Sequence, residues 1–182
     1  MKQNLKINLG CGNVRMKGYV GMDVVKLPAV DVVHDLNKFP YPFKDNSVQE
    51  VFADNVLEHV ENLVRVMEEL HRICVPGAII KIYVPYAKSD GAFKDPTHKN
   101  FFMERTFQYF SPAHVYNFYS KARFEVMTLK HISNSNDFRQ KVRNIIPFRK
   151  FLKFFLLNMY DTLYFELKVL KQSTRVNRKS ER

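Results

Sequence analysis

Two glycines and an acid near the start of the chain have the spacing of a nucleoside-binding site. Gly10 and Gly12 follow a short apolar run, and Asp23 closes the next one. Glycine has no Cβ, so a ligand can lie against bare backbone at such a turn. An acid at the end of the neighbouring strand can accept hydrogen bonds from both ribose hydroxyls. The pattern therefore predicts a cofactor that contains a nucleoside.

The elements that would position these residues alternate between strands and helix. The helix is predicted over residues 61–74, where apolar side chains recur at spacings of three and four, and Ser111-Pro112 predicts the start of another that ends near Ala122. The strands are predicted from β-branched and aromatic runs at 5–9, 19–24, 30–34, 49–55, 78–84, 124–132 and 162–170. Such alternation indicates an α/β fold with a mostly parallel sheet.

The first two connections between strands are too short for helices. Six residues separate Gly12 from Tyr19, and five separate Val24 from Val30. A parallel crossover normally needs about a dozen residues. Either the sheet lacks its first crossover helices, or these strands pair differently.

The positive charge is concentrated in the last quarter of the chain. Residues 138–182 hold 12 Lys/Arg and 3 Asp/Glu, a net +9 of the total +11. This asymmetry favours one localised basic surface over a uniformly basic, nucleic-acid-binding one. Cys11 and Cys74 have no CxxC spacing, so neither a disulfide framework nor a zinc site is predicted, and a cytoplasmic location is expected. No apolar run reaches the ~18 residues of a membrane span, and no room is left for a signal peptide.

Several segments follow one another in a characteristic order. They are NLGCGN, the acid Asp23, the stretch 32–60, PGAIIKIYVP and, further on, DPTHKNFF at 95–102. Together they resemble the class I S-adenosylmethionine-dependent methyltransferases, in particular small ones placed among glycan or surface-polysaccharide genes. The resemblance implies a Rossmann-like sheet with an antiparallel last strand in one domain of residues 1–172. The family usually has an acid where this chain has Asn8 and a third glycine where it has Val14.

The resemblance implies S-adenosylmethionine as cofactor and S-adenosylhomocysteine as product. Gly10 and Gly12 would lie against the methionine end, Asp23 would bind the ribose, and Asn55 would contact the amino-acid end through its backbone. The complete expected cofactor set is Asn8, Gly10, Cys11, Gly12, Asp23, Asp35, Leu36 and Asn55, with Asp35 at the adenine amino group and Leu36 against its ring. A tight turn, a strand end or an Asx-type cap would explain the same residues without a ligand. A dinucleotide dehydrogenase fits poorly, because Asp23 follows Gly10 by 13 residues instead of about 20 and the third glycine is missing.

Histidines supply the expected catalytic groups. Methyl transfer from a sulfonium is an in-line displacement that depends on positioning, and a hydroxyl acceptor also gains from a base. We expect His98, oriented by Asp95, and His59 to be catalytic, with His114 a further histidine in reach of the site. Loop hydrogen bonding by His98 and bracing by His59 are the structural alternatives. A divalent metal shared by Asp and His residues is an open alternative, but no metal site is assigned because no ligand spacing predicts one.

Residues 133–160 form a predicted basic amphipathic insertion between the last two strands. Its segment 138–160 mixes lysine and arginine with phenylalanine, leucine and isoleucine. That composition suits contact with an anionic membrane and a lipid-linked glycan acceptor. The alternative is a helix whose apolar side covers the domain or a second subunit of a homodimer. Residues 173–182 are predicted to be a flexible tail.

The predicted function is methylation of a hydroxyl on a sugar or surface-glycan precursor. The protein would act in the cytoplasm, with peripheral contact at the inner face of the membrane. Nucleic acid is a less favoured partner, but an RNA methyltransferase that grips phosphates with the basic segment is an alternative. A non-catalytic partner protein with the methyltransferase fold is a second alternative, since Asn8 and Val14 depart from the family pattern.

Overall fold

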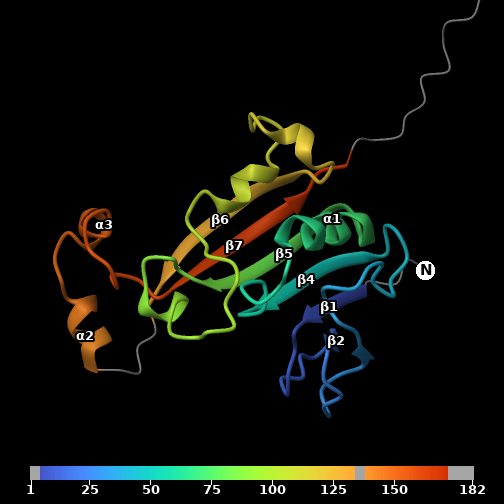
Figure 1. The fold of residues 1–182 in the computed structure, drawn as a ribbon, viewed down its shortest axis with the longest axis horizontal. Coiled ribbons are helices and arrows are strands. Elements are labelled where there is room, and N and C mark those ends of the chain that lie inside the picture. Colours follow the sequence, from blue (N-terminus) through green and yellow to red (C-terminus); the bar gives the residue numbers. More distant parts are fainter. Residues whose placement is uncertain (1–4, 134–137, 172–182) are drawn as a thin grey trace, which may run out of the picture.

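Seven strands form one mixed sheet in the computed structural model, which describes residues 5–133 and 138–171 (Figure 1). The strand order is β3-β2-β1-β4-β5-β7-β6. The first five strands run parallel, and β7 is antiparallel to both β5 and β6. The predicted mostly parallel sheet with an antiparallel end is confirmed. The strands are β1 (Leu5–Leu9), β2 (Val20–Asp23), β3 (Val32–Val33), β4 (Val48–Asp54), β5 (Cys74–Pro85), β6 (Phe124–Ile132) and β7 (Thr162–Val169).

The first two crossovers contain no helix, so the sheet is indeed trimmed at this end. β1, β2 and β3 nevertheless pair in parallel. The Asp31 carboxylate accepts a hydrogen bond of 2.8 Å from the backbone N–H of Gly21, which ties the second connection to β2. A Cβ on Gly21 would lie 2.4 Å from the carbonyl oxygen of Ala29. The loop therefore packs directly on the strand, where a longer connection would place a helix.

The predicted first helix is confirmed as α1 (Leu63–Ile73). Asn62 caps it, because its side-chain oxygen accepts a hydrogen bond of 3.0 Å from the backbone N–H of Arg65. The helix buries an apolar stripe against the sheet, made by Val66, Met67, Leu70 and Ile73. It runs straight into β5 at Cys74, so Pro76 and Gly77 lie inside that strand instead of before it.

The predicted helix over residues 111–122 is wrong. The structure has turns and one short 3₁₀ segment there, η3 (Asn117–Tyr119), and two more 3₁₀ segments precede it, η1 (Asp90–Ala92) and η2 (Thr106–Phe110). Phe107 and Phe110 are buried and fasten η2 to the sheet. The residues that follow have no continuous apolar stripe facing the protein, since Val115, Tyr116 and Tyr119 are exposed. Aromatic and β-branched residues are modest helix formers, and here no buried face compensates for their low helix propensity.

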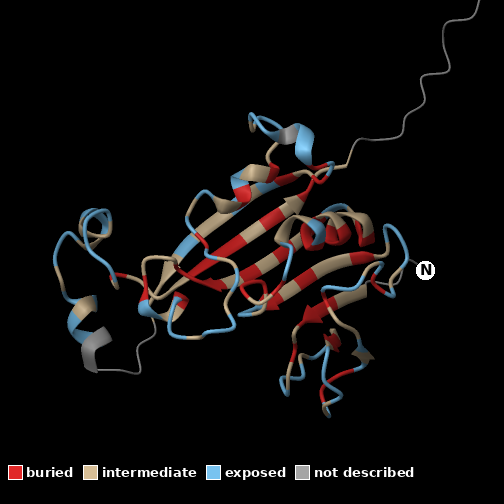
Figure 2. Ribbon diagram, in the orientation of Figure 1, coloured by how far each residue is buried: buried red, intermediate tan, exposed pale blue. Residues whose placement is uncertain are grey.

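The two faces of the sheet are built differently. One face packs against α1 and the 3₁₀ segments and forms the core, which appears as buried bands on the strands in Figure 2. The described residues place no helix on the other face. A row of charges crosses it instead, with Glu50 accepting from Lys6 at 3.0 Å and from Lys81 at 2.6 Å. Beside this row, the rings of Tyr83 and Tyr164 lie 4.5 Å apart. Cross-strand pairs of these kinds stabilise a sheet without a covering layer.

The insertion lies beyond one end of the sheet as α2 (Phe138–Asn144) and α3 (Arg149–Leu152) (Figure 1). The alternative in which its apolar side covers the domain is wrong. Two of its cations turn inward, with Lys153 on Glu104 at 3.0 Å and Arg143 on Asp161 at 3.4 Å. Large apolar side chains face outward: Ile145, Phe148, Phe151, Phe154, Phe155, Leu156 and Leu157. Residues 134–137 of the insertion and the predicted tail 173–182 lie outside the described residues.

Candidate functional site

A cavity of about 340 Å³ lies at the carboxyl ends of the parallel strands, and we refer to it as the loop cavity. This edge is where open α/β sheets bind ligands. Five of the residues predicted to bind the cofactor meet there, from β1, β2, β4 and the loop after β3. They are Gly10, Asp23, Asp35, Leu36 and Asn55, and their neighbours in the wall are Val24, His34, Asn37, Val56, His59 and Val60.

The acid at the end of β2 is already tied to the glycine loop. Asp23 Oδ2 accepts a hydrogen bond of 2.8 Å from the backbone N–H of Gly12, and Oδ1 accepts one of 3.1 Å from that of Val25. Each carboxylate oxygen can accept a further hydrogen bond. The acid is thus held in place with acceptor capacity left for ribose hydroxyls.

Three predicted cofactor residues do not line the loop cavity. Asn8 is buried, and its amide donates to the carbonyl oxygen of Val14 at 3.4 Å. Cys11 is buried with its thiol against the carbonyl oxygen of Ala29. Gly12 is held against Asp23. Asn8 and Cys11 therefore shape the turn from behind.

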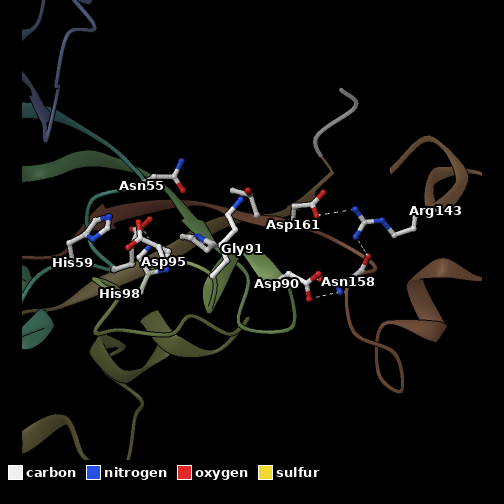
Figure 3. Close-up of a pocket in the computed structure, with 13 residues that line it drawn as sticks. Asn55, His59, Asp90, Gly91, Asp95, His98, Arg143, Asn158 and Asp161 are labelled. Carbon is white, nitrogen blue, oxygen red and sulfur yellow. Dashed lines mark hydrogen bonds and ion pairs between the residues drawn. The ribbon is translucent and has the colours of Figure 1, made fainter. Parts of the chain in front are cut away.

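A second, larger cavity of about 720 Å³ adjoins the first, and we call it the polar cavity (Figure 3). Asn55 and His59 line both cavities, so they form a shared wall. Asn55 has a left-handed backbone with φ of 48°, which is uncommon for a residue other than glycine. Strain of this kind is concentrated at functional sites.

The predicted catalytic residues His59, Asp95 and His98 all line the polar cavity. His98 Nδ1 lies 2.9 Å from the carbonyl oxygen of Ala92, so this nitrogen must carry the proton and donate it. The hydroxyl of Thr97 donates to Asp95 at 2.7 Å and therefore accepts from His59 Nδ1 at 2.9 Å. In both rings the lone pair is thus left on Nε2. His98 Nε2 lies 3.8 Å from the Asp95 carboxylate.

Sequence reasoning missed Glu58, the residue between Leu57 and His59. Its side chain is 1% exposed, and neither carboxylate oxygen has a hydrogen-bond partner among the described residues. Burial raises the pKa of Glu58 to about 7. An acid next to a candidate histidine was visible in the sequence. Its inward orientation was not, because it depends on how the loop after β4 turns.

The loop after β4 and the segment 95–100 are fastened together. The carbonyl oxygen of Glu58 accepts from the backbone N–H groups of Lys99 at 2.7 Å and Asn100 at 3.0 Å. The Asn100 side chain donates to the carbonyl oxygen of Val60 at 2.6 Å. These bonds bring His98 beside His59, with ring centroids 4.8 Å apart.

The insertion supplies the far wall of the polar cavity. Asn158 donates to Asp90 at 2.7 Å, and Arg143 pairs with Asp161 (Figure 3). His114 lies outside both cavities and packs near Tyr109. The histidine pair is therefore His59 and His98.

Residues 13–82 match the family model of a methyltransferase domain. The matched residues include β2, β3, β4, α1 and most of β5, and they hold all the residues that line the loop cavity except Gly10. Residues 13–82 are thus a methyltransferase domain, and the fold around them is that of the class I S-adenosylmethionine-dependent methyltransferases. No curated protein matches its sequence.

Solved structures with the same fold are distant in sequence from this methyltransferase. A SAM-dependent methyltransferase from Archaeoglobus fulgidus has a TM-score of 0.60 and 16% identity, with 92% of this chain and 87% of that one covered. An S-adenosylmethionine-dependent methyltransferase from Mesorhizobium loti has a TM-score of 0.57 and 12% identity, with 92% of this chain and 93% of that one covered. A putative methyltransferase from Haloferax volcanii, in complex with the Trm112 methyltransferase activator, has a TM-score of 0.59 and 14% identity, with 93% of this chain and 84% of that one covered. At these identities the likeness shows the fold.

S-adenosylmethionine is the cofactor of this methyltransferase, and the loop cavity fits it. A Cβ on Gly12, which has a φ of 49°, would meet nothing within 4 Å, so the backbone there is open to a ligand. Asp23 keeps acceptor capacity for hydroxyls, and Leu36 offers an apolar wall for a ring. Gly10 differs, because Val56 lies directly against it.

Proposed function

We propose that this methyltransferase methylates a hydroxyl of a sugar-containing acceptor held in the polar cavity. The observation that carries the proposal is the shared wall of Asn55 and His59, which puts a polar cavity next to the loop cavity. When bound in the loop cavity, S-adenosylmethionine supplies an electrophilic methyl group. The task left to the chain is to hold an acceptor oxygen beside that wall.

The lining of the polar cavity suits a neutral, hydroxyl-rich ligand. It offers hydrogen-bond acceptors and donors side by side, as a polyol requires. The acceptors include Asp90, Asp95 and Asp161, and the donors include Lys94, Arg143 and Asn158. A ligand that carries many phosphates would face the three carboxylates at close range.

The same contacts argue against an RNA methyltransferase. Three cations of the insertion are engaged inside the protein: Arg143 pairs with Asp161, Lys153 with Glu104, and Arg149 donates to the carbonyl oxygen of Met159 at 2.8 Å. Fewer charges are then free to grip phosphates. RNA binding that weakens steeply with salt would support the RNA alternative instead.

We further propose that the acceptor is carried on a lipid at an anionic membrane. The insertion both lines the polar cavity and exposes an apolar surface with cations beside it. The exposed side chains named above would enter the interface, with Lys141 and Lys150 near lipid headgroups. The sugar of a lipid-linked acceptor could then reach the cavity while its lipid stays in the membrane. No helix among the described residues is long and apolar enough to cross a bilayer.

His98→Ala tests the assignment of the polar cavity. We expect turnover to fall by at least about 100-fold, the range for loss of a catalytic acid–base group, while calorimetry gives nearly unchanged affinity for S-adenosylmethionine. Asp23→Ala should do the reverse and weaken cofactor binding by roughly tenfold or more, the loss expected for charge-assisted hydrogen bonds. His114→Ala is the control with neither effect.

Transfer of tritiated methyl groups into fractionated cell extracts identifies the acceptor. Label in the glycan or lipid fraction is the expected result. Label confined to RNA or protein would contradict the proposed acceptor. Absence of any cofactor binding by the intact protein would remove the assignment of the loop cavity.

A further inference from the structure

We propose that Glu58, His59 and His98 bind one divalent transition-metal ion at the edge of the polar cavity. One ligand atom from each of the three side chains lies within 4.8 Å of the other two. Two of them come from the loop after β4 and the third from the segment 95–100, which backbone hydrogen bonds hold against that loop. Backbone hydrogen bonds between two separate segments therefore hold the three side chains of the cluster together.

Each of the three side chains has a lone pair that no hydrogen bond among the described residues uses. Both rings donate their Nδ1 proton to a protein oxygen, His98 to Ala92 and His59 to Thr97, and keep the Nε2 lone pair. Glu58 adds a carboxylate with no donor among the described residues. Groups that can only accept hydrogen bonds repel one another, whereas a shared cation can receive a lone pair from each of the three.

The burial of Glu58 gives the second, independent observation. A carboxylate that is 1% exposed and has no hydrogen bond is costly to keep in a folded protein. The other buried acid among the described residues, Glu69, has partners: it accepts from Arg72 at 2.5 Å and from the backbone N–H of Tyr41 at 2.6 Å. A bound cation would supply the missing partner of Glu58.

The geometry allows a metal after a small closure. The centre of a triangle with sides of 4.8 Å lies about 2.8 Å from each corner, against the ~2.0–2.2 Å of metal bonds to nitrogen and oxygen. Each ligand would move by roughly 0.7 Å, a side-chain adjustment. The hydrogen bonds from the Nδ1 atoms are the outer contacts that usually orient metal-binding histidines.

The ligand set selects the class of ion. Two imidazoles and one carboxylate suit zinc, iron(II), manganese(II) or a similar ion, whereas magnesium and calcium prefer oxygen ligands throughout. Three protein ligands leave coordination positions open toward the cavity. A hydroxyl that coordinates there loses its proton to water more readily. This last role rests on the proposed function, but the binding of the ion does not.

Calorimetry on metal-stripped protein tests the site directly, with Zn²⁺ and Mn²⁺ as probes and Mg²⁺ as a comparison. We expect one equivalent of Zn²⁺, bound at least 100-fold more weakly by Glu58→Gln or His98→Ala and normally by His114→Ala. Equal Zn²⁺ binding by wild type and both site variants would overturn the proposal, as would a preference for Mg²⁺.

Thermal melting provides a measurement that does not involve the reaction. Without metal, Glu58→Gln should melt higher than wild type, because it removes an unpaired buried charge. Zn²⁺ should raise the melting temperature of wild type and leave that of Glu58→Gln unchanged. A wild-type melting temperature that does not change when Zn²⁺ is added would overturn the proposed metal site.

The site and the reaction can fail separately. Zn²⁺ binding at the site without any transfer to glycan or lipid would refute the proposed function and leave the metal site intact. Full transfer by metal-free protein would overturn the role in activating the hydroxyl and leave His98 as a base.

Discussion

At the loop after β1, two glycines that look alike in the sequence have different surroundings. Both have a left-handed backbone, with φ of 59° at Gly10 and 49° at Gly12. A Cβ on Gly10 would lie 2.3 Å from Cγ2 of Val56, while a Cβ on Gly12 would meet nothing within 4 Å. Gly10 is therefore required by packing inside the protein as well as by backbone conformation, and Gly12 by conformation alone.

Gly10→Ala and Gly12→Ala should differ in stability for this reason. Gly12→Ala should lower the free energy of unfolding by about 1–2 kcal/mol, the cost of a left-handed alanine. Gly10→Ala should lose roughly 1–3 kcal/mol more, because an overpacked contact is added. Urea denaturation measures both. A double variant, Gly10→Ala with Val56→Ala, should recover the additional loss, and equal losses in the two single variants would contradict the packing argument.

At the scale of single residues, the candidate site was partly predictable from the sequence. His59, Asp95 and His98 were predicted from residue type and position, and the structure brings them to one cavity. Glu58 was not, because the sequence does not show whether an acid in a loop faces water or the interior. Asn8 was expected at the ligand, yet it faces away from the loop cavity and braces the turn. Side-chain direction in loops is set by tertiary packing, which no local pattern records.

Among the elements, the amphipathic pattern of the insertion is compatible with two orientations, with either its apolar or its basic side facing the protein. Its mixture of basic and apolar residues was evident in the sequence, but a covering helix would have turned the apolar side inward. The structure instead turns Arg143, Arg149 and Lys153 inward, and the Arg149 guanidinium lies 4.2 Å from the ring centroid of Tyr160. The short crossovers were predictable, since chain length alone forbids a helix. The absence of a helix at 111–122 was not predictable. The capping signal at Ser111 is local, whereas the lack of a buried face depends on how the rest of the chain packs.

The exposed rings in α3 and just after it should carry membrane binding. Phe151 and Phe155 are 60% and 72% exposed and lie 5.2 Å apart, so replacing both by serine should leave the fold intact. We expect sedimentation with anionic vesicles to fall by roughly tenfold or more, from the apolar area lost to the interface. Phe118→Ser, equally exposed but outside the insertion, is the matched control. Identical sedimentation by both variants would contradict a membrane role for α3.

At the scale of the whole molecule, the sheet is stabilised by burial on one side and by polar pairing on the other. Although burial raises the pKa of Glu50, hydrogen bonds from Lys81, Tyr19 and Lys6 bring it down to about 2. Burial likewise raises the pKa of Glu104, and bonds from Lys153, its own backbone, His131 and Tyr86 lower it to about 2. One acid joins β1, β4 and β5, and the other fastens the insertion to the sheet.

Acid should therefore unfold this protein in a defined range. Between its lowered pKa of about 2 and its ordinary value of 4.5, native Glu50 binds fewer protons than it does in the unfolded chain, so stability rises with pH there. Glu50→Gln should cost about 1–2 kcal/mol at pH 7 and progressively less toward pH 2. Urea denaturation across pH measures this. Glu125→Gln is the control, since its contact to Lys168 is 3.9 Å and exposed. A constant difference between Glu50→Gln and wild type from pH 7 to 2 would contradict the argument.

The shared wall of Asn55 and His59 makes the two cavities thermodynamically linked. Any ligand that shifts this wall changes the affinity of the neighbouring cavity, and linkage requires the same factor in both directions. An acceptor that strengthens cofactor binding must therefore itself bind more tightly when the cofactor is present. Such coupling is a property of the junction that neither cavity has alone.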